Sequence, residues 1–93
     1  MAYAEARHIL VPTEEECNTL KAEIEGGASF AEVASKKSEC PSGATGGELG
    51  RFTPGQMVPE FDKAVFGEAG VGELQGPIKT DFGYHLLEVT ARG

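Results

Sequence analysis

The chain has 93 residues, of which 40% are apolar and 25% charged, so it is too short for a large multi-domain enzyme and too apolar for a disordered segment. Its 15 acidic and eight basic residues give a net charge of −7, and the basic residues form no long run. Because nucleic acids and anionic membranes are bound by positive surfaces, we expect neither as a partner. The sequence shows no apolar stretch long enough to span a bilayer and no secretion signal, so we expect a cytoplasmic protein.

Two cysteines, Cys17 and Cys40, match neither a secreted disulfide scaffold nor a CxxC motif. We therefore expect free thiols in a reducing compartment. Together with His8 and His85 they match no zinc-finger or zinc-ribbon spacing, so we expect no metal site.

The chain begins with a predicted strand followed by a predicted helix. The strand covers residues 5–11 and ends at Pro12, which cannot donate to a β-ladder. Thr13 with Glu16 three residues later is a capping box, which marks a helix start, and Gly26 marks its end. The apolar stripe of this helix consists of Cys17, Leu20 and Ile24.

A second helix is predicted directly after the first. Ser29 and Glu32 repeat the capping-box spacing, and the pattern continues to about Ser38. Its apolar stripe consists of Phe30, Val33 and Ala34.

The middle of the chain is rich in turns, because nine of the 13 glycines fall between Gly43 and Gly76. Two short elements are predicted there: a strand over residues 48–52, and a helix over residues 59–66 that has proline in its first turn. Gly67 ends this helix.

The end of the chain alternates like a β-hairpin. Strands are predicted over residues 77–80 and 84–90, with a turn at 81–83. One face of the last strand carries His85, Leu87 and Val89, and the other carries Tyr84, Leu86 and Glu88. The order of elements predicts one small α+β sandwich with helices packed around a single sheet.

Five segments in this order resemble the parvulin-type peptidyl-prolyl cis/trans isomerases, the rotamases of the PpiC kind. They are HIL at 8–10, SEC at 38–40, GGELG at 46–50, GQMVPEF at 55–61 and FGYH at 82–85. The chain resembles the small single-domain bacterial members, so residues 1–93 are expected to form one catalytic domain. The resemblance implies a four-stranded antiparallel sheet surrounded by helices, in the order β-α-α-(short α)-β-α-β-β.

The resemblance also implies a proline pocket. Its substrate-binding residues would be Ser38, Leu49, Met57, Phe61 and Phe82. Its catalytic residues would be His8, Cys40, Thr80 and His85. In this interpretation the two histidines are neutral, bonded to each other, and orient the Cys40 thiol and the Thr80 hydroxyl.

The chemistry that such a site has to perform is rotation about an X-Pro amide, whose barrier is about 18–20 kcal/mol. No covalent bond has to form and no cofactor is needed. An apolar pocket that grips the proline ring and desolvates the carbonyl would favour the twisted amide over the planar one. The expected partners are proline-containing segments of unfolded or flexible proteins, bound by a monomer; covalent attack by Cys40 is the minor alternative.

The residues after the first predicted strand differ from those of the parvulins that bind phosphorylated substrates. Members that require phosphoserine or phosphothreonine carry a basic cluster after the first strand, where this chain has Glu14–Glu16. Three carboxylates repel a phosphate, so we expect no phospho-dependence and a mild preference for apolar or basic residues before proline.

Two other classes of function are alternatives to an isomerase. A Cys–His hydrolase is disfavoured because the sequence shows no oxyanion-stabilising device. The main alternative is a chaperone-like binding module of the same fold that holds peptide segments with little turnover. A proline-limited refolding assay separates that module from an isomerase.

Overall fold

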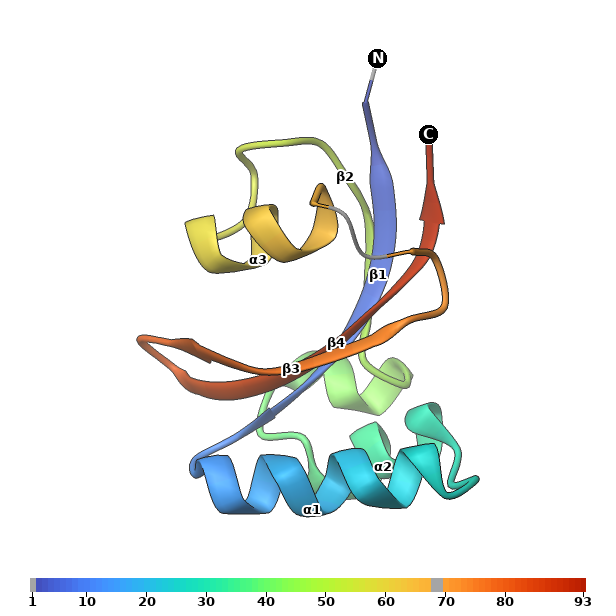
Figure 1. Ribbon diagram of the computed structural model, residues 1–93, viewed down its shortest axis with the longest axis vertical. Helices are drawn as coiled ribbons and strands as arrows, with labels where there is room; N and C mark the ends of the chain where they lie inside the picture. The colour runs from blue at the N-terminus through green and yellow to red at the C-terminus, as the bar shows by residue number, and fades with distance from the viewer. Residues whose placement is uncertain (1, 68–69) are drawn as a thin grey trace.

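The computed structural model describes residues 2–67 and 70–93 and has one antiparallel sheet with helices on both faces (Figure 1). The strands are β1 (Ala4–Val11), β2 (Glu48–Phe52), β3 (Leu74–Thr80) and β4 (Gly83–Arg92), in the spatial order β2-β1-β4-β3. The helices are α1 (Glu14–Glu25), α2 (Phe30–Lys37), the 3₁₀ helix η1 (Pro41–Thr45) and α3 (Pro59–Val65). The expected fold class and element order are confirmed. No helix in the described ranges is long and apolar enough to cross a membrane.

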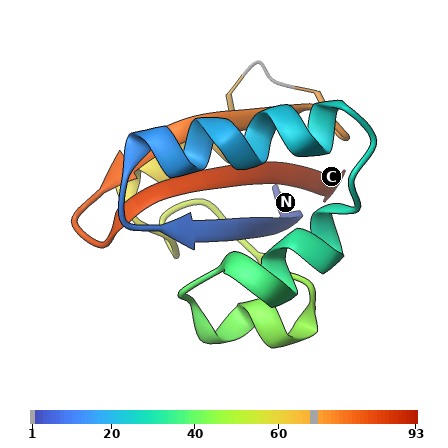
Figure 2. The ribbon, with the colours of Figure 1, turned by 90° about the horizontal axis from the view of Figure 1, so that it is seen from below.

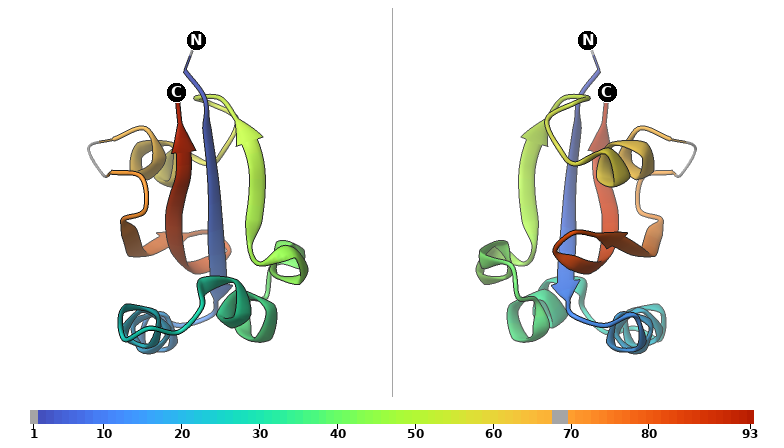
Figure 3. Two further views of the ribbon diagram at one scale, coloured as in Figure 1. Left: turned by 90° about the vertical axis from the view of Figure 1, so that its right-hand side faces the viewer. Right: turned by 90° about the vertical axis from the view of Figure 1, so that its left-hand side faces the viewer.

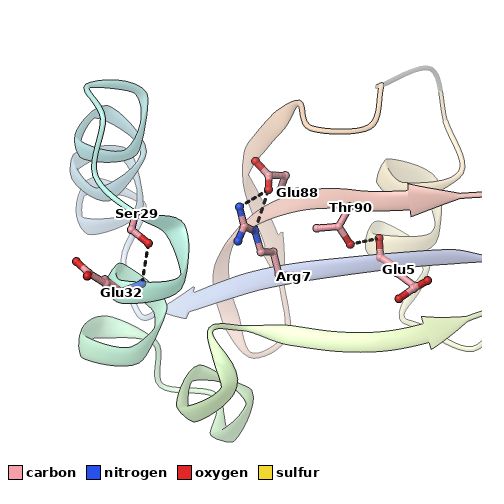
Figure 4. Close-up of polar contacts among 6 residues, drawn as sticks. All are labelled: Glu5, Arg7, Ser29, Glu32, Glu88 and Thr90. Carbon is pink, nitrogen blue, oxygen red and sulfur yellow. Dashed lines mark hydrogen bonds and ion pairs between the residues drawn. The ribbon is translucent and has the colours of Figure 1, made fainter.

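Both predicted helix starts are confirmed by their caps. The Thr13 hydroxyl accepts a hydrogen bond from the Glu16 N–H at 3.2 Å, and the Ser29 hydroxyl accepts one from the Glu32 N–H at 3.3 Å (Figure 4). Each cap satisfies a backbone donor that the first helical turn leaves without a partner. The second helix ends at Lys37, because Ser38 adopts an extended backbone conformation.

Each face of the sheet is covered by a different set of helices. In Figures 1 and 2, α1 and α2 lie against one face, and α3 lies against the other. The alternation predicted for β4 is confirmed, because Leu86 packs with α1 and α2 whereas Leu87 and Val89 pack with α3. Burying each large apolar side chain stabilises the fold by roughly 1.5–3 kcal/mol.

A charged pair between β1 and β4 supports the α2 side of the sheet. Arg7 lies directly opposite Glu88, and its Nη2 atom is 2.6 Å from Glu88 Oε1 (Figure 4). The same guanidinium lies 4.6 Å from the centre of the Phe30 ring, the first residue of α2. The pair therefore ties the two central strands to the start of α2.

The hairpin at the end of the chain is longer than the sequence predicts. β3 begins at Leu74 rather than Pro77, and β4 extends to Arg92. Leu74 and Gln75 pair with β4, but the register shifts between Gln75 and Ile78. The Gly76-Pro77 dipeptide at this irregularity resembles a turn in sequence, which hides the first part of the strand.

The two ends of the described chain are joined by backbone hydrogen bonds. The Tyr3 N–H donates to the Gly93 carbonyl at 2.9 Å, and the Gly93 N–H donates to the Tyr3 carbonyl at 3.0 Å. Figure 3 shows the two ends side by side, where β1 begins and β4 ends.

Candidate active site

A cavity of about 380 Å³ lies on the α3 side of the sheet. Its volume is within the range of ligand pockets in proteins. Eight of the nine predicted site residues line it, and Ser38 does not. The described residues that line it are His8, Leu10, Glu39, Cys40, Pro41, Leu49, Met57, Val58, Phe61, Thr80, Phe82 and His85.

The histidines reach the cavity through the register of the two central strands. Leu10 pairs with His85 across β1 and β4, so His8, two residues before Leu10, lies on the same face as His85. Phe61 of α3 packs its ring edge-on against both imidazoles, with centroid distances of 4.6 Å to His85 and 5.5 Å to His8. Phe61 therefore shields the histidine pair from solvent.

Five side chains form one continuous chain of polar contacts along the cavity. Thr80 Oγ1 lies 2.7 Å from His85 Nε2, and His85 Nδ1 lies 3.1 Å from His8 Nδ1. His8 Nε2 then lies 3.1 Å from the hydroxyl oxygen of Ser42, and this oxygen lies 3.3 Å from the sulfur of Cys40. The expected contact between the two histidines is present. The contact expected between an imidazole and the thiol is replaced by one through Ser42.

Both imidazoles are held in their neutral form. Burial lowers the pKa of His8 below its ordinary value of 6.5. Burial, followed by repulsion from His8, lowers the pKa of His85 to about 4. Desolvation disfavours the charged ring, and two cations could not share the contact between the Nδ1 atoms.

Ser38 acts on the backbone instead of lining the cavity. Its hydroxyl accepts hydrogen bonds from the Leu10 N–H at 3.0 Å and from the Cys40 N–H at 3.3 Å. With both contacts directed to backbone amides, the side chain positions the segment that carries Cys40 against the end of β1. Ser38 is therefore not among the residues that line the cavity, and its expected role in substrate binding stays a prediction.

The two cysteines lie in different environments. Cys17 is fully buried in the apolar cluster under α1, where burial raises the pKa of its thiol to about 11. Cys40 is half-buried and lines the cavity. A buried thiol of raised pKa is inert, so the expectation that Cys17 is a core residue is confirmed.

The aromatic residues of the cavity differ in exposure. Phe82 is 72% exposed at the turn between β3 and β4, whereas Phe61 is only 4% exposed. Phe61 is buried because α3 packs its ring into the core cluster. Met57 is half-buried between these extremes.

Several residues of the site carry no signal in the sequence. Ser42 does not line the cavity but joins the polar chain; it lies in a 3₁₀ turn, and a serine in a turn shows no periodicity that would connect it with His8. Four residues that do line the cavity were missed: Leu10, Glu39, Pro41 and Val58. The carboxylate at the cavity is Glu39, because none of Glu14–Glu16 lines it. Within the described ranges no group of three or more His, Cys, Asp or Glu is arranged to hold a metal ion.

Known proteins are similar to this chain in both sequence and fold. The foldase protein PrsA of Exiguobacterium sibiricum is 46% identical over 88 residues, which are 94% of this chain and 29% of that protein. The crystal structure of the peptidylprolyl isomerase PrsA from Bacillus anthracis has a TM-score of 0.95 at 35% identity and covers 99% of this chain and 42% of its own. The solution structure of NmPin, the parvulin of Nitrosopumilus maritimus, has a TM-score of 0.85 at 34% identity, with 98% of both chains covered.

The coverage of these relatives defines how far the likeness extends. This chain spans less than a third of the length of the PrsA relative, whereas it matches NmPin along nearly its whole length. The family model of the rotamase, PPIC-type PPIase domain matches residues 8–91, which include every residue that lines the cavity. The chain therefore belongs to the PpiC-type peptidyl-prolyl isomerase domain family.

Proposed function

We propose that this domain accelerates cis/trans interconversion of X-Pro bonds in unfolded or flexible polypeptides, without a cofactor and without a covalent intermediate. The observation that carries this proposal is the apolar cavity with the polar chain from Thr80 to Cys40 along its wall. Uncatalysed interconversion takes tens to hundreds of seconds, so modest acceleration is useful to a folding chain.

The apolar part of the cavity suits the proline ring. Met57, Phe61 and Leu49 lie together on the α3 side, and Phe82 adds an exposed ring at the rim. A flexible thioether and aromatic rings can enclose a five-membered apolar ring. Gripping that ring holds one side of the amide while the other side rotates.

The polar part of the cavity can donate a hydrogen bond to the rotating carbonyl. The chain of polar contacts can run in either of two directions, depending on which histidine carries the proton on Nδ1. When His85 donates from Nδ1 to His8, the Thr80 hydroxyl donates to His85 and the Cys40 S–H is free. When His8 donates from Nδ1, the direction reverses along the whole chain, and the Thr80 O–H is free. One wall of the cavity or the other therefore always offers a donor to the carbonyl.

A non-covalent mechanism is favoured by the surroundings of the thiol. The polar partner of Cys40 Sγ in this chain of contacts is the Ser42 hydroxyl, and Ser42 in turn contacts His8. A nucleophilic cysteine is normally activated by a base within direct hydrogen-bonding distance. Rotation about an amide needs no such attack.

The test of this function is a proline-limited refolding assay with a client that has a single slow proline phase. We expect the wild-type domain to increase the rate of that phase and Met57→Ala to reduce kcat/KM by about tenfold or more. Ile24→Ala is the matched control, because Ile24 is a half-buried apolar residue packed on the opposite face of the sheet. No acceleration by the wild type would exclude the proposed activity.

A second candidate function is peptide holding with little turnover. The specific observation that favours it is the exposed apolar rim, where Phe82 is 72% and Val58 is 37% exposed. Clusters of exposed apolar side chains mark binding surfaces. A holding module would suppress aggregation of a client that lacks slow proline phases and would leave the rate of a proline-limited phase unchanged.

The location and oligomeric state are also part of the proposal. The free thiols of Cys17 and Cys40 fit a reducing compartment, and the net charge of −7 disfavours self-association. We propose a monomer that works in the cytoplasm. Light scattering on the purified chain and cell fractionation measure these two properties directly.

A further inference from the structure

One cavity residue has no part in the proposed isomerisation step: Glu39. Among the described residues that line the cavity, it is the one carboxylate, and none of the others is a lysine or an arginine. Its charge is therefore available for recognition of the substrate.

The backbone at Glu39 is fixed, while its side chain is exposed. The Glu39 N–H donates to the Leu10 carbonyl at 2.8 Å, and the next N–H, of Cys40, donates to Ser38 Oγ at 3.3 Å. The two ion pairs found within residues 2–67 and 70–93 are Arg7–Glu88 and Arg51–Glu5, so neither uses Glu39. A carboxylate that forms no ion pair with a described residue, on a backbone held by hydrogen bonds, can pair with a cation of a ligand.

The position of this carboxylate relative to a bound peptide follows from the proposed function, on which the inference rests. In the proposed function the proline ring packs against Met57 and Phe61, and the rotating carbonyl is bound by Cys40 or Thr80, which line the same cavity. That carbonyl belongs to the residue before proline. Because Glu39 directly precedes Cys40, the side chain of the residue before proline comes within reach of the Glu39 carboxylate.

We infer that Glu39 is a specificity-determining residue that favours lysine or arginine immediately before proline and disfavours aspartate, glutamate or phosphoserine there. An exposed charge pair has a modest effect, so the expected preference for Lys-Pro over Leu-Pro is about two- to fivefold in kcat/KM. The preference decreases with added salt, because exposed charges are screened over a distance of about 10 Å at 0.1 M ionic strength.

Exchange NMR on a peptide series tests this inference. The peptides have the form Ala-Xaa-Pro-Phe, where Xaa is lysine, leucine or glutamate, and the readouts are the Lys/Leu and Glu/Leu ratios of kcat/KM. We expect Glu39→Gln to bring both ratios closer to one. Glu15→Gln is the matched control, because it removes the same charge from an exposed site in the first turn of α1 that does not line the cavity.

The possible outcomes separate the inference from the function on which it rests. Unchanged ratios in Glu39→Gln, or an equal change in Glu15→Gln, overturn the role of Glu39 while leaving the isomerase activity intact. If the wild type turns over no peptide, the proposed function fails; the inference is then decided by NMR titration of the same peptides. In that titration, a Lys-Pro peptide that binds no more tightly to the wild type than to Glu39→Gln overturns the inference.

Discussion

His8 and His85 meet through their Nδ1 atoms at 3.1 Å, with their ring planes 17° apart. Because a hydrogen bond needs one donor and one acceptor, only one of the two Nδ1 atoms holds a proton in this contact, and the other neutral ring carries its N–H on Nε2. The tautomer of one ring therefore determines the tautomer of the other. The two tautomers in turn determine whether the hydroxyls of Thr80 and Ser42 donate to the histidines or accept from them. The pair can work in this way only while both rings are neutral.

Acid should destabilise the domain through His85. Its pKa lies at about 4 in the folded protein, below the ordinary 6.5, chiefly because of burial. Above the ordinary pKa the ring is neutral in both states, so its contribution to stability is fully present there. As the pH falls towards 4, the unfolded state takes up the proton first, and the free energy of unfolding decreases. Urea denaturation at about pH 7 and about pH 5 measures this decrease.

The variant His85→Gln is the control for this pH dependence, because carboxylates also titrate in acid. It replaces the ring by a neutral side chain, so its stability should decrease less between the two pH values than that of the wild type. Equal decreases in the two proteins would show that His85 makes no contribution.

Replacing Cys40 should have a limited effect on turnover. If the thiol only adjusts the field at the carbonyl, Cys40→Ser should retain activity within about tenfold, because a hydroxyl keeps a polar hydrogen at this wall. Loss of an obligatory nucleophile usually costs far more, on the order of 10⁴-fold or greater. Values of kcat/KM from exchange NMR decide between the two, and a loss of that larger size would establish covalent catalysis.

Thr80 should matter through its hydroxyl and not through its shape. Thr80→Val keeps the volume but leaves His85 Nε2 without its 2.7 Å partner and removes the acceptor of the Phe82 N–H. We expect kcat to fall by about tenfold or more, with Thr80→Ser recovering most of it. The ¹⁵N NMR chemical shifts of the His85 ring should change in Thr80→Val and stay the same in Thr80→Ser. A fully active valine variant would remove Thr80 from the mechanism.

Two glycines with similar backbone angles should respond differently to alanine. Gly47 has φ 86°, and a Cβ there would collide with the backbone carbonyl of His8, whereas Gly50 has φ 75° and open space around it. Gly47→Ala should therefore reduce the free energy of unfolding by about 3 kcal/mol or more. Gly50→Ala should reduce the free energy of unfolding by only about 1 kcal/mol, the cost of placing alanine in a left-handed backbone conformation. Urea denaturation measures both, and similar costs would contradict the collision at His8.

Signals local to the sequence were sufficient for most of the elements. Thr13 and Ser29 identify helix starts because a cap is a contact between residues close in the chain. The alternation around His85 identifies both faces of β4, because the period of a strand is two. The five segments that resemble the family then indicated which residues gather around the cavity.

Contacts between distant residues were what the sequence could not provide. Ser42 enters the polar chain only because η1 packs against α2 and β2 and places the hydroxyl beside His8 of β1. The Ser38 hydroxyl binds two backbone amides and does not line the cavity. The first part of β3 was hidden for a related reason: Gly76-Pro77 has the composition of a turn, and only pairing with β4 shows that the strand continues through it.

The pairing of Tyr3 with Gly93 determines how the domain would respond to mechanical force. Antiparallel hydrogen bonds run perpendicular to their strands, so pulling the two chain ends apart acts along the bonds between β1 and β4. The hydrogen bonds between the two strands would therefore break one after another, beginning with the pair formed by Tyr3 and Gly93. A stretched polypeptide carrying this domain would therefore open it at low tension, and His8 and His85 would separate only after the outer pairs had given way.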